Sequence, residues 1–161
     1  MRPTPTAGTP FKGTYREDGW RRCGQMSIED GITFTPWPHP VMPGFSLPAL
    51  EAAKCIAKQG DEMFERVHMA LYEAYFTRSL DIADPGVLAH LVGEAGADLA
   101  RFDADRGAGF ARAAVVADYE AAVSEHGVRA IPTVILPETG RALVGLADLA
   151  TYRAAIEEAA G

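Results

Sequence analysis

Eight of the eleven prolines in this 161-residue chain lie within its first 48 residues. Proline fixes φ and lacks a backbone N–H, so this density works against regular helix and central strand alike. We therefore expect an irregular N-terminal arm over residues 1–31. One short strand is predicted after it, over Ile32–Trp37, because Ile32 and Phe34 alternate with threonines.

Residues 46–126 carry the signals of several helices. Capping residues, a glycine stop and apolar spacing predict helices that begin near Ser46, Asp61, Asp84 and Arg106, the last of them ending at Glu125. In the second of these helices, apolar side chains recur on one face, at Phe64, Val67, Leu71 and Tyr75. A short turn is expected around Leu99 and Phe102.

The C-terminal region differs in character from the helical block. Ala130–Leu136 is rich in β-branched residues, Pro137–Gly140 has the composition of a turn, and Arg141–Gly145 is a second strand candidate. Two such runs around a short turn predict a β-hairpin. A final helix is expected from Ala147 to about Ala159. The order of strand, helices, hairpin and helix indicates the α/β class.

The most informative segment is Gly127–Ile135, which reads Gly-Val-Arg-Ala-Ile-Pro-Thr-Val-Ile. Pro132 stands at the entrance of the predicted strand, where it cannot donate a ladder hydrogen bond. Two explanations fit this position. Either the strand is an edge strand that tolerates a proline, or the Ile131–Pro132 bond is cis and exposes backbone groups to a ligand.

This segment, with a long helix before it and Leu-Val-Gly and a terminal helix after it, resembles the C-terminal part of DsbA-type thioredoxin-fold proteins. Within that family it is similar to the FrnE-like oxidoreductases and the relatives of 2-hydroxychromene-2-carboxylate isomerase. The resemblance extends over about residues 32–160. It includes the segments 46–60, 64–68 and 81–84.

The resemblance implies both a domain layout and a ligand site. It implies an incomplete thioredoxin-like (DsbA-like) fold over residues 32–161, with a large helical insertion at about 46–126 and a C-terminal hairpin and helix at 130–160. In the family, the residue before the cis-proline binds a thiol peptide or glutathione through its backbone, and this role falls on Ile131 and Pro132. His39 is a third ligand-binding candidate, because the matching family loop approaches the ligand site.

The two cysteines do not match the redox motif of this family. Redox members carry Cys-x-x-Cys at the first strand–helix junction, whereas Cys23 and Cys55 stand far apart in the sequence. The first 31 residues hold no apolar run for that strand, so we expect the N-terminal strand–helix unit to be absent. Disulfide exchange needs an attacking thiolate and a second, resolving thiol. Cys23 is the catalytic candidate because two arginines precede it, and Cys55 is expected to be buried.

Three functional hypotheses remain open at this point. The first is a DsbA-family thiol–disulfide oxidoreductase homologue that is weak or inactive alone, because it has no Cys-x-x-Cys. The second is a glutathione-dependent protein of the isomerase or transferase type. The third is a non-catalytic binding or assembly module.

Composition excludes several other classes of function. A formal net charge of -7 argues against a nucleic-acid partner. The apolar stretches are shorter than the roughly 18 residues that suggest a membrane span, and the start lacks the apolar core of a signal peptide, so we expect a cytoplasmic protein with no membrane partner. Metal and nucleotide motifs are missing from the sequence, and no cofactor is expected unless glutathione binds.

The expected partners are a thiol-containing peptide or glutathione, and other copies of the same chain. The predicted hairpin and the Ile32 strand leave unpaired backbone edges and exposed apolar surface, both of which favour association. We therefore expect a homodimer or a higher oligomer.

Overall fold

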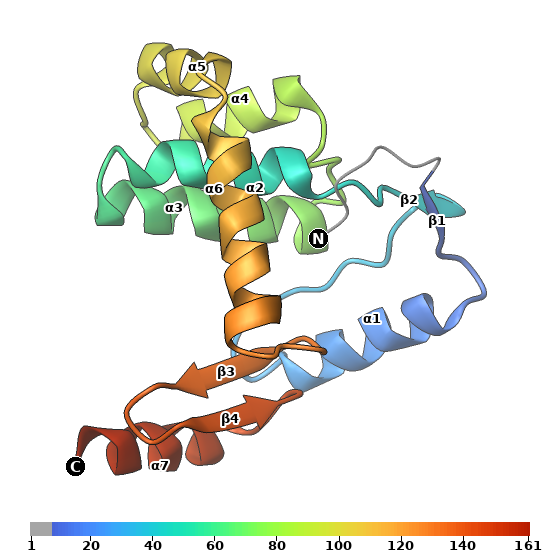
Figure 1. Cartoon of the computed structure of the whole chain (residues 1–161). Coiled ribbons are helices and arrows are strands. Elements are labelled where there is room, and N and C mark those ends of the chain that lie inside the picture. The colour runs from blue at the N-terminus through green and yellow to red at the C-terminus, as the bar shows by residue number, and fades with distance from the viewer. Residues whose placement is uncertain (1–7) are drawn as a thin grey trace. The chain divides into compact units, whose positions relative to one another are not determined.

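The structure of the protein, a computed structural model, describes residues 8–161 (Figure 1). The chain forms two compact units, of which the first extends to Val116 and the second comprises Ala117–Gly161. Residues 1–7 of the expected N-terminal arm lie outside the described residues.

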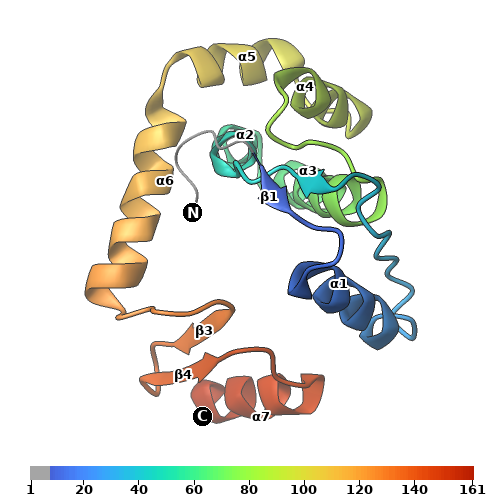
Figure 2. The same ribbon diagram turned by 90° about the vertical axis from the view of Figure 1, so that its right-hand side faces the viewer.

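Helices make up most of the first unit (Figures 1 and 2). The four that pack against one another are α2 (Leu47–Ala57), α3 (Asp61–Tyr72), α4 (Pro85–Glu94) and α5 (Leu99–Gly107). A π-helical turn over Glu73–Thr77 prolongs α3. The predicted start of α4 is confirmed, because the Asp84 carboxylate accepts the backbone N–H groups of Gly86 and Val87 at 2.7 and 3.0 Å.

These helices enclose an apolar core. Its buried members are Ala49, Ala52, Cys55, Ile56, Val67, Leu71, Ala74, Leu88, Leu91, Val92, Phe102 and Ala111. The turn expected around Leu99 and Phe102 is wrong, because this segment is helix α5. Asp98 caps α5 by accepting the Arg101 N–H at 3.0 Å, and the Phe102 ring is fully buried in the core.

The long helix predicted over residues 106–125 is interrupted near its start. Gly109 adopts a φ of 74°, a conformation that glycine takes without strain, and α6 (Phe110–Glu120) begins directly after it. A π-helical turn over Ala121–Glu125 ends the helical stretch, as the sequence predicted.

The expected irregular arm is wrong over Tyr15–Met26, which form helix α1. Prolines are absent between Pro10 and Pro36, so the high proline density of the N-terminal region does not apply to this segment. The Thr14 hydroxyl accepts the Arg16 N–H and caps the helix. Trp20 anchors it in a second apolar cluster, whose buried members are Phe11, Trp20, Trp37 and Met42.

The strand predicted over Ile32–Trp37 is also wrong. This segment is irregular, and the first unit contains instead a short antiparallel pair formed by β1 (Thr9–Pro10) and β2 (Val41–Met42). Single hydrogen bonds hold the segment in place: the Thr35 N–H donates to the Phe76 carbonyl at 2.8 Å, and the Thr77 hydroxyl donates to the Thr33 carbonyl at 2.6 Å. Ring contacts add to these hydrogen bonds: Phe34 contacts Trp20 and Phe76, and Trp37 contacts Tyr75.

The second unit contains the predicted hairpin and final helix (Figure 2). β3 (Thr133–Leu136) pairs antiparallel with β4 (Arg141–Val144), and α7 (Leu149–Ala160) packs against β3. The register places Thr133 opposite Val144 and Leu136 opposite Arg141. The helix-rich α/β class expected from the sequence is confirmed, with few strands.

None of the helices in residues 8–161 has both the length and the apolar character that crossing a bilayer requires.

Candidate functional site

The loop before β3 carries the ligand-binding candidates Ile131 and Pro132. The peptide bond between them is cis. The Gly145 N–H donates to the Pro132 carbonyl at 2.8 Å, and the Thr133 hydroxyl donates to the Ala130 carbonyl at 2.8 Å. These two hydrogen bonds hold the backbone on both sides of Ile131.

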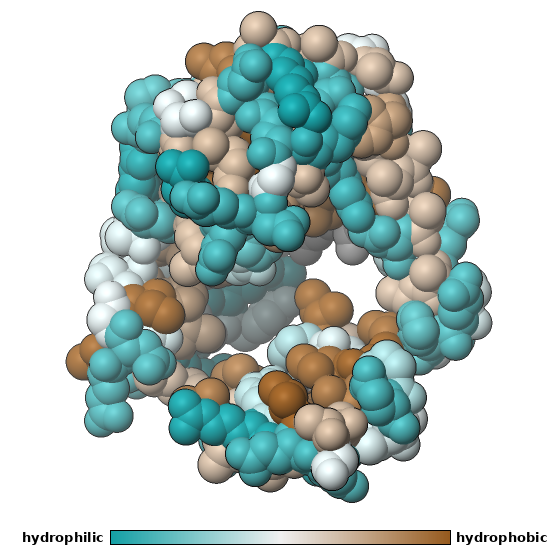
Figure 3. Space-filling view, turned by 90° about the vertical axis from the view of Figure 1, so that its left-hand side faces the viewer, coloured by the Kyte–Doolittle hydropathy of each residue, from teal (hydrophilic) through white to brown (hydrophobic). Residues whose placement is uncertain are grey.

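Ile131 itself is open to solvent. The residue is 90% exposed, and among the described residues its backbone N–H and C=O have no hydrogen-bond partner. Three more exposed apolar residues, Val144, Leu146 and Leu149, come from the end of β4 and the segment that leads into α7. Figure 3 shows hydrophobic residues in brown among hydrophilic ones in teal on the face that it draws. Free backbone groups beside apolar side chains suit an extended peptide.

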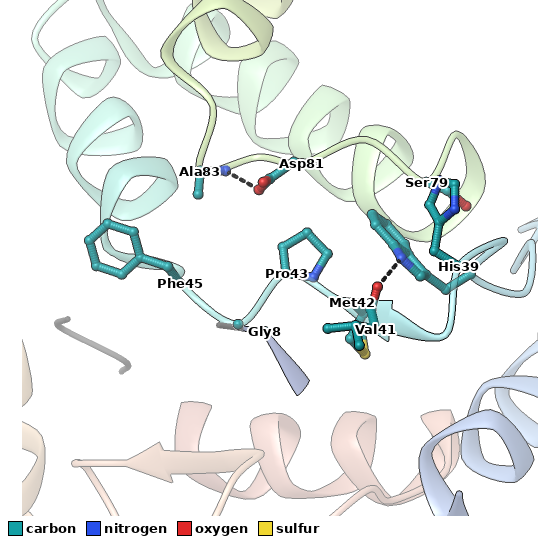
Figure 4. Close-up of a pocket in the computed structure, with 11 residues that line it drawn as sticks. Gly8, His39, Val41, Met42, Pro43, Phe45, Ser79, Asp81 and Ala83 are labelled. Atoms are coloured by element: carbon teal, nitrogen blue, oxygen red, sulfur yellow. Dashed lines mark hydrogen bonds between the residues drawn. The ribbon is translucent and has the colours of Figure 1, made fainter. Parts of the chain in front are cut away.

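His39 belongs to the first unit, where it lines a cleft of about 580 Å³ (Figure 4). The other lining residues are Gly8, Trp37, Val41, Met42, Pro43, Gly44, Phe45, Ser79, Asp81 and Ala83. The Trp37 indole N–H donates to the Val41 carbonyl at 2.9 Å, and the Asp81 carboxylate accepts the Ala83 N–H at 2.9 Å. Polar and apolar groups contribute about equally to the walls of this cleft.

Ser79 and Asp81 are cleft residues that the sequence analysis did not single out. Ser79 adopts a φ of 52°, and its hydroxyl is buried without a hydrogen-bond partner among the described residues. Both residues belong to the connection between the π-helical turn and α4, far along the chain from His39. Hydrophobic periodicity and short motifs describe residues that are close in the sequence. They therefore do not predict a contact between two loops that are distant in the sequence.

The two cysteines occupy different environments within the first unit. Cys23 is exposed on α1, and Cys55 is fully buried on α2. Burial raises the pKa of the Cys55 thiol, and the Asp105 carboxylate raises it further. Helices α1 and α2 do not pack against each other, so the two sulfurs are not placed for a disulfide, which needs Cα atoms about 4.4–6.8 Å apart.

The described residues contain no group of three or more histidine, cysteine or acidic side chains that could hold a metal ion.

Comparison with known proteins places this arrangement in a class. The cis-proline hairpin with its terminal helix and the helical block are features of a thioredoxin-type α/β protein with a helical insertion. The model of the DSBA-like thioredoxin domain matches residues 25–157. The chain therefore belongs to the DSBA-like thioredoxin domain family, a family of the thiol–disulfide oxidoreductase type.

A solved structure supports the same fold. The crystal structure of "a putative protein disulfide isomerase from Nitrosomonas europaea" superposes with a TM-score of 0.74 at 18% sequence identity. The superposition covers 98% of this chain and 78% of that chain. At this identity the similarity establishes the fold alone. None of the curated proteins matches the chain.

Proposed function

We propose that this chain is a DsbA-family thiol–disulfide oxidoreductase homologue that binds a thiol-containing peptide at Ile131 and Pro132 and has little dithiol activity of its own. Within the family we assign it to the cytoplasmic, FrnE-like branch, on the similarity of the Gly127–Ile135 motif and segment 46–60.

The observation that carries the proposal is the free backbone of Ile131. Its N–H and C=O lie beside an exposed apolar surface and have no partner among the described residues. A peptide that runs past this residue in an extended conformation would exchange main-chain hydrogen bonds with it. The backbone supplies affinity for any extended chain, whereas the surrounding Val144 and Leu146 favour apolar neighbours of the substrate cysteine.

The cysteines limit what chemistry can follow binding. When the Cys23 thiolate attacks a substrate disulfide, a mixed disulfide forms and the other substrate sulfur leaves as a thiolate. Completion requires a second thiol to attack the mixed disulfide, and the buried Cys55 thiol does not approach α1. The second thiol must therefore come from solution, for example from glutathione, which keeps turnover slow.

Binding is tested by titrating the ¹⁵N-labelled chain with a reduced cysteine-containing peptide and following amide resonances. Ile131→Pro removes the proposed donor, and we expect the affinity to fall about tenfold, the value of one hydrogen bond of about 1.4 kcal/mol. Ala130→Pro is the matched control, since it introduces the same ring one residue away and its own N–H donates no hydrogen bond in the structure. Equal affinity for the two variants contradicts the proposal.

The catalytic half is tested by insulin reduction with dithiothreitol. We expect a rate close to that of a free-thiol control. Any residual rate should disappear in Cys23→Ser and persist in Cys55→Ser. Rapid turnover that either substitution abolishes would show that the two cysteines work as a pair.

Glutathione takes the place of the peptide in the second hypothesis, and the same site serves both ligands. Retention on glutathione-agarose that Ile131→Pro weakens and Ala130→Pro preserves would favour a glutathione-dependent protein. Peptide binding without retention would favour the peptide. Binding of either ligand with no disulfide chemistry at all would favour the binding-module hypothesis.

His39 remains a proposed contributor to ligand binding, through the cleft of the first unit. An imidazole that lines this cleft can donate a hydrogen bond to a carboxylate such as those of glutathione. His39→Ala should then weaken glutathione binding more than it weakens binding of a peptide amidated at its C-terminus.

A further inference from the structure

The connection between β4 and α7, residues 145–148, contains no regular secondary structure. Individual hydrogen bonds therefore determine where its backbone lies. At its start, the Gly145 N–H donates to the Pro132 carbonyl at 2.8 Å. Two residues further on, the Ala147 N–H donates to the Tyr152 hydroxyl at 3.3 Å. The connection is thus bonded to the ligand-site loop at one end and to a side chain of α7 at the other.

Gly145 turns the chain so that both bonds can form. It adopts a φ of 86°, a conformation that glycine takes without strain and that other residues rarely adopt. The turn follows directly after Val144, the last residue of β4, which pairs with Thr133. No atom lies within 4 Å of the place that a Cβ on Gly145 would occupy. A substitution of this glycine therefore disturbs the backbone conformation without causing a clash.

Leu146 lies between the two bonded positions, and the residue is 70% exposed. In the proposed peptide complex this side chain is one of the apolar neighbours of the substrate cysteine. The N–H groups of Gly145 and Ala147 are both bonded, so the backbone of Leu146 is held on both sides. Removal of the Tyr152 hydroxyl would release one of the two sides.

We propose that Tyr152 is a positioning residue of the ligand site. Its hydroxyl fixes the connection between β4 and α7, and thereby both the bond from Gly145 to Pro132 and the position of Leu146. This inference rests on the proposed peptide binding, and Tyr152 acts through the connection without contacting the peptide. A purely local role, as an additional cap at the start of α7, would leave the bond of Gly145 unchanged. The two roles therefore give different results at Gly145.

Hydrogen exchange of the Gly145 amide tests whether the effect of Tyr152 reaches the ligand-site loop. Tyr152→Phe keeps the ring and removes the hydroxyl. The Gly145 amide should then exchange about two- to fivefold faster, because part of the contribution of one hydrogen bond is lost. The Val128 amide, which donates to the Ala122 carbonyl within the same unit, is the internal reference and should exchange as in the wild type. An unchanged exchange rate at Gly145 would overturn the proposal.

Titration of the same variant with the reduced cysteine-containing peptide tests the consequence for binding. We expect Tyr152→Phe to weaken the affinity about threefold. Tyr119→Phe removes an exposed hydroxyl from α6 in the same unit and should bind the peptide like the wild type. Wild-type affinity in Tyr152→Phe would contradict the positioning role. A wild-type chain that binds no peptide would contradict the proposed function instead, and the exchange rate of Gly145 would still show whether Tyr152 holds the loop.

A double-mutant cycle tests whether Tyr152 acts through Gly145. Gly145→Ala should weaken peptide binding more than Tyr152→Phe does, because it disturbs the bond to Pro132 itself. If the hydroxyl acts through this bond, the double variant should bind about as weakly as Gly145→Ala alone. Losses of affinity that multiply in the double variant would show that the two residues act independently, and would overturn the proposal.

Discussion

The two units of the molecule differ in how far their large apolar side chains are buried. In the first unit, the apolar side chains of α2 to α5 face one another and form a buried core. In the second unit, Ala155 is the one buried residue among Ala117–Gly161, while Ile131, Val144, Leu146 and Leu149 are mostly exposed. Burial of apolar area is the main source of folding free energy. The first unit therefore supplies most of the folding free energy that comes from burial, whereas the large apolar side chains of the second stay exposed.

The largest difference between the two units is expected in the free energy of unfolding when one apolar side chain in each is truncated to alanine. Phe102→Ala removes a fully buried ring from the core of the first unit and should lower the free energy of unfolding by about 3–5 kcal/mol. Ile156→Ala in α7 truncates an exposed side chain and should change it by no more than about 0.5 kcal/mol.

Urea titrations followed by two signals measure this difference. Both tryptophans, Trp20 and Trp37, lie in the first unit, so their fluorescence reports its unfolding, and circular dichroism reports all helices. A large loss of stability in Ile156→Ala would show that the second unit has a core of its own, contrary to this comparison.

The second prediction concerns the two thiols, of which Cys23 is exposed and Cys55 is buried. Cys23 should react with Ellman's reagent at once, and Cys55 at least about a hundredfold more slowly, because a local opening of about 2.7 kcal/mol lowers the reactive fraction by that factor. Reaction of both thiols at similar rates in the native protein would contradict burial of Cys55.

The raised pKa of Cys55 also predicts a pH dependence with a definite sign. The folded state keeps this thiol protonated at a pH where the unfolded chain has lost the proton. Stability is therefore unaffected below the ordinary thiol pKa of about 8.5 and falls as the pH rises above it. Urea midpoints between pH 8 and pH 10 should fall less steeply in Cys55→Ala than in the wild type.

The sequence predicted those parts of the fold that local signals determine. Asp84 and the following proline mark the start of α4 because a cap acts within one turn. The hairpin and the cis bond at Pro132 were also predicted, the latter from the family resemblance. Helix α1 was missed because the proline density was averaged over 48 residues, although Thr14–Met26 contains none.

The site was predictable only in part. Ile131 and Pro132 belong to one continuous motif, so the sequence placed them together. Ser79 and His39 meet in a cleft through the folding of two separate loops, which leaves no mark on local composition. Long-range contacts of this kind depend on tertiary packing. The same holds for Ile32–Trp37, which forms no strand, because Trp37 packs against Tyr75 in the second apolar cluster.

The third prediction compares the helix caps of the two units, beginning with the first. Asp84→Ala removes the acceptor of two backbone N–H groups at the start of α4 and should lower the free energy of unfolding by about 1 kcal/mol. Tryptophan fluorescence in urea measures the change, and Asp84→Asn, which keeps an acceptor oxygen, should recover most of it. No difference between the alanine and asparagine variants would show that the cap does not contribute.

The smallest effect is expected at the matching cap of the second unit, and it depends on pH. The Thr151 backbone N–H donates to the Asp148 carboxylate at 2.7 Å and lowers the pKa of that carboxyl. A lowered pKa gives stability that is present above the ordinary aspartate pKa of about 3.9 and is lost as the pH falls through the folded-state value. The cap of α7 should therefore loosen in acid. The amide resonance of Thr151 reports this titration directly, and its pH-dependent shift should be absent in Asp148→Asn. Persistence of the shift in that variant would assign it to another carboxyl group and remove Asp148 as the acid-sensitive cap of the second unit.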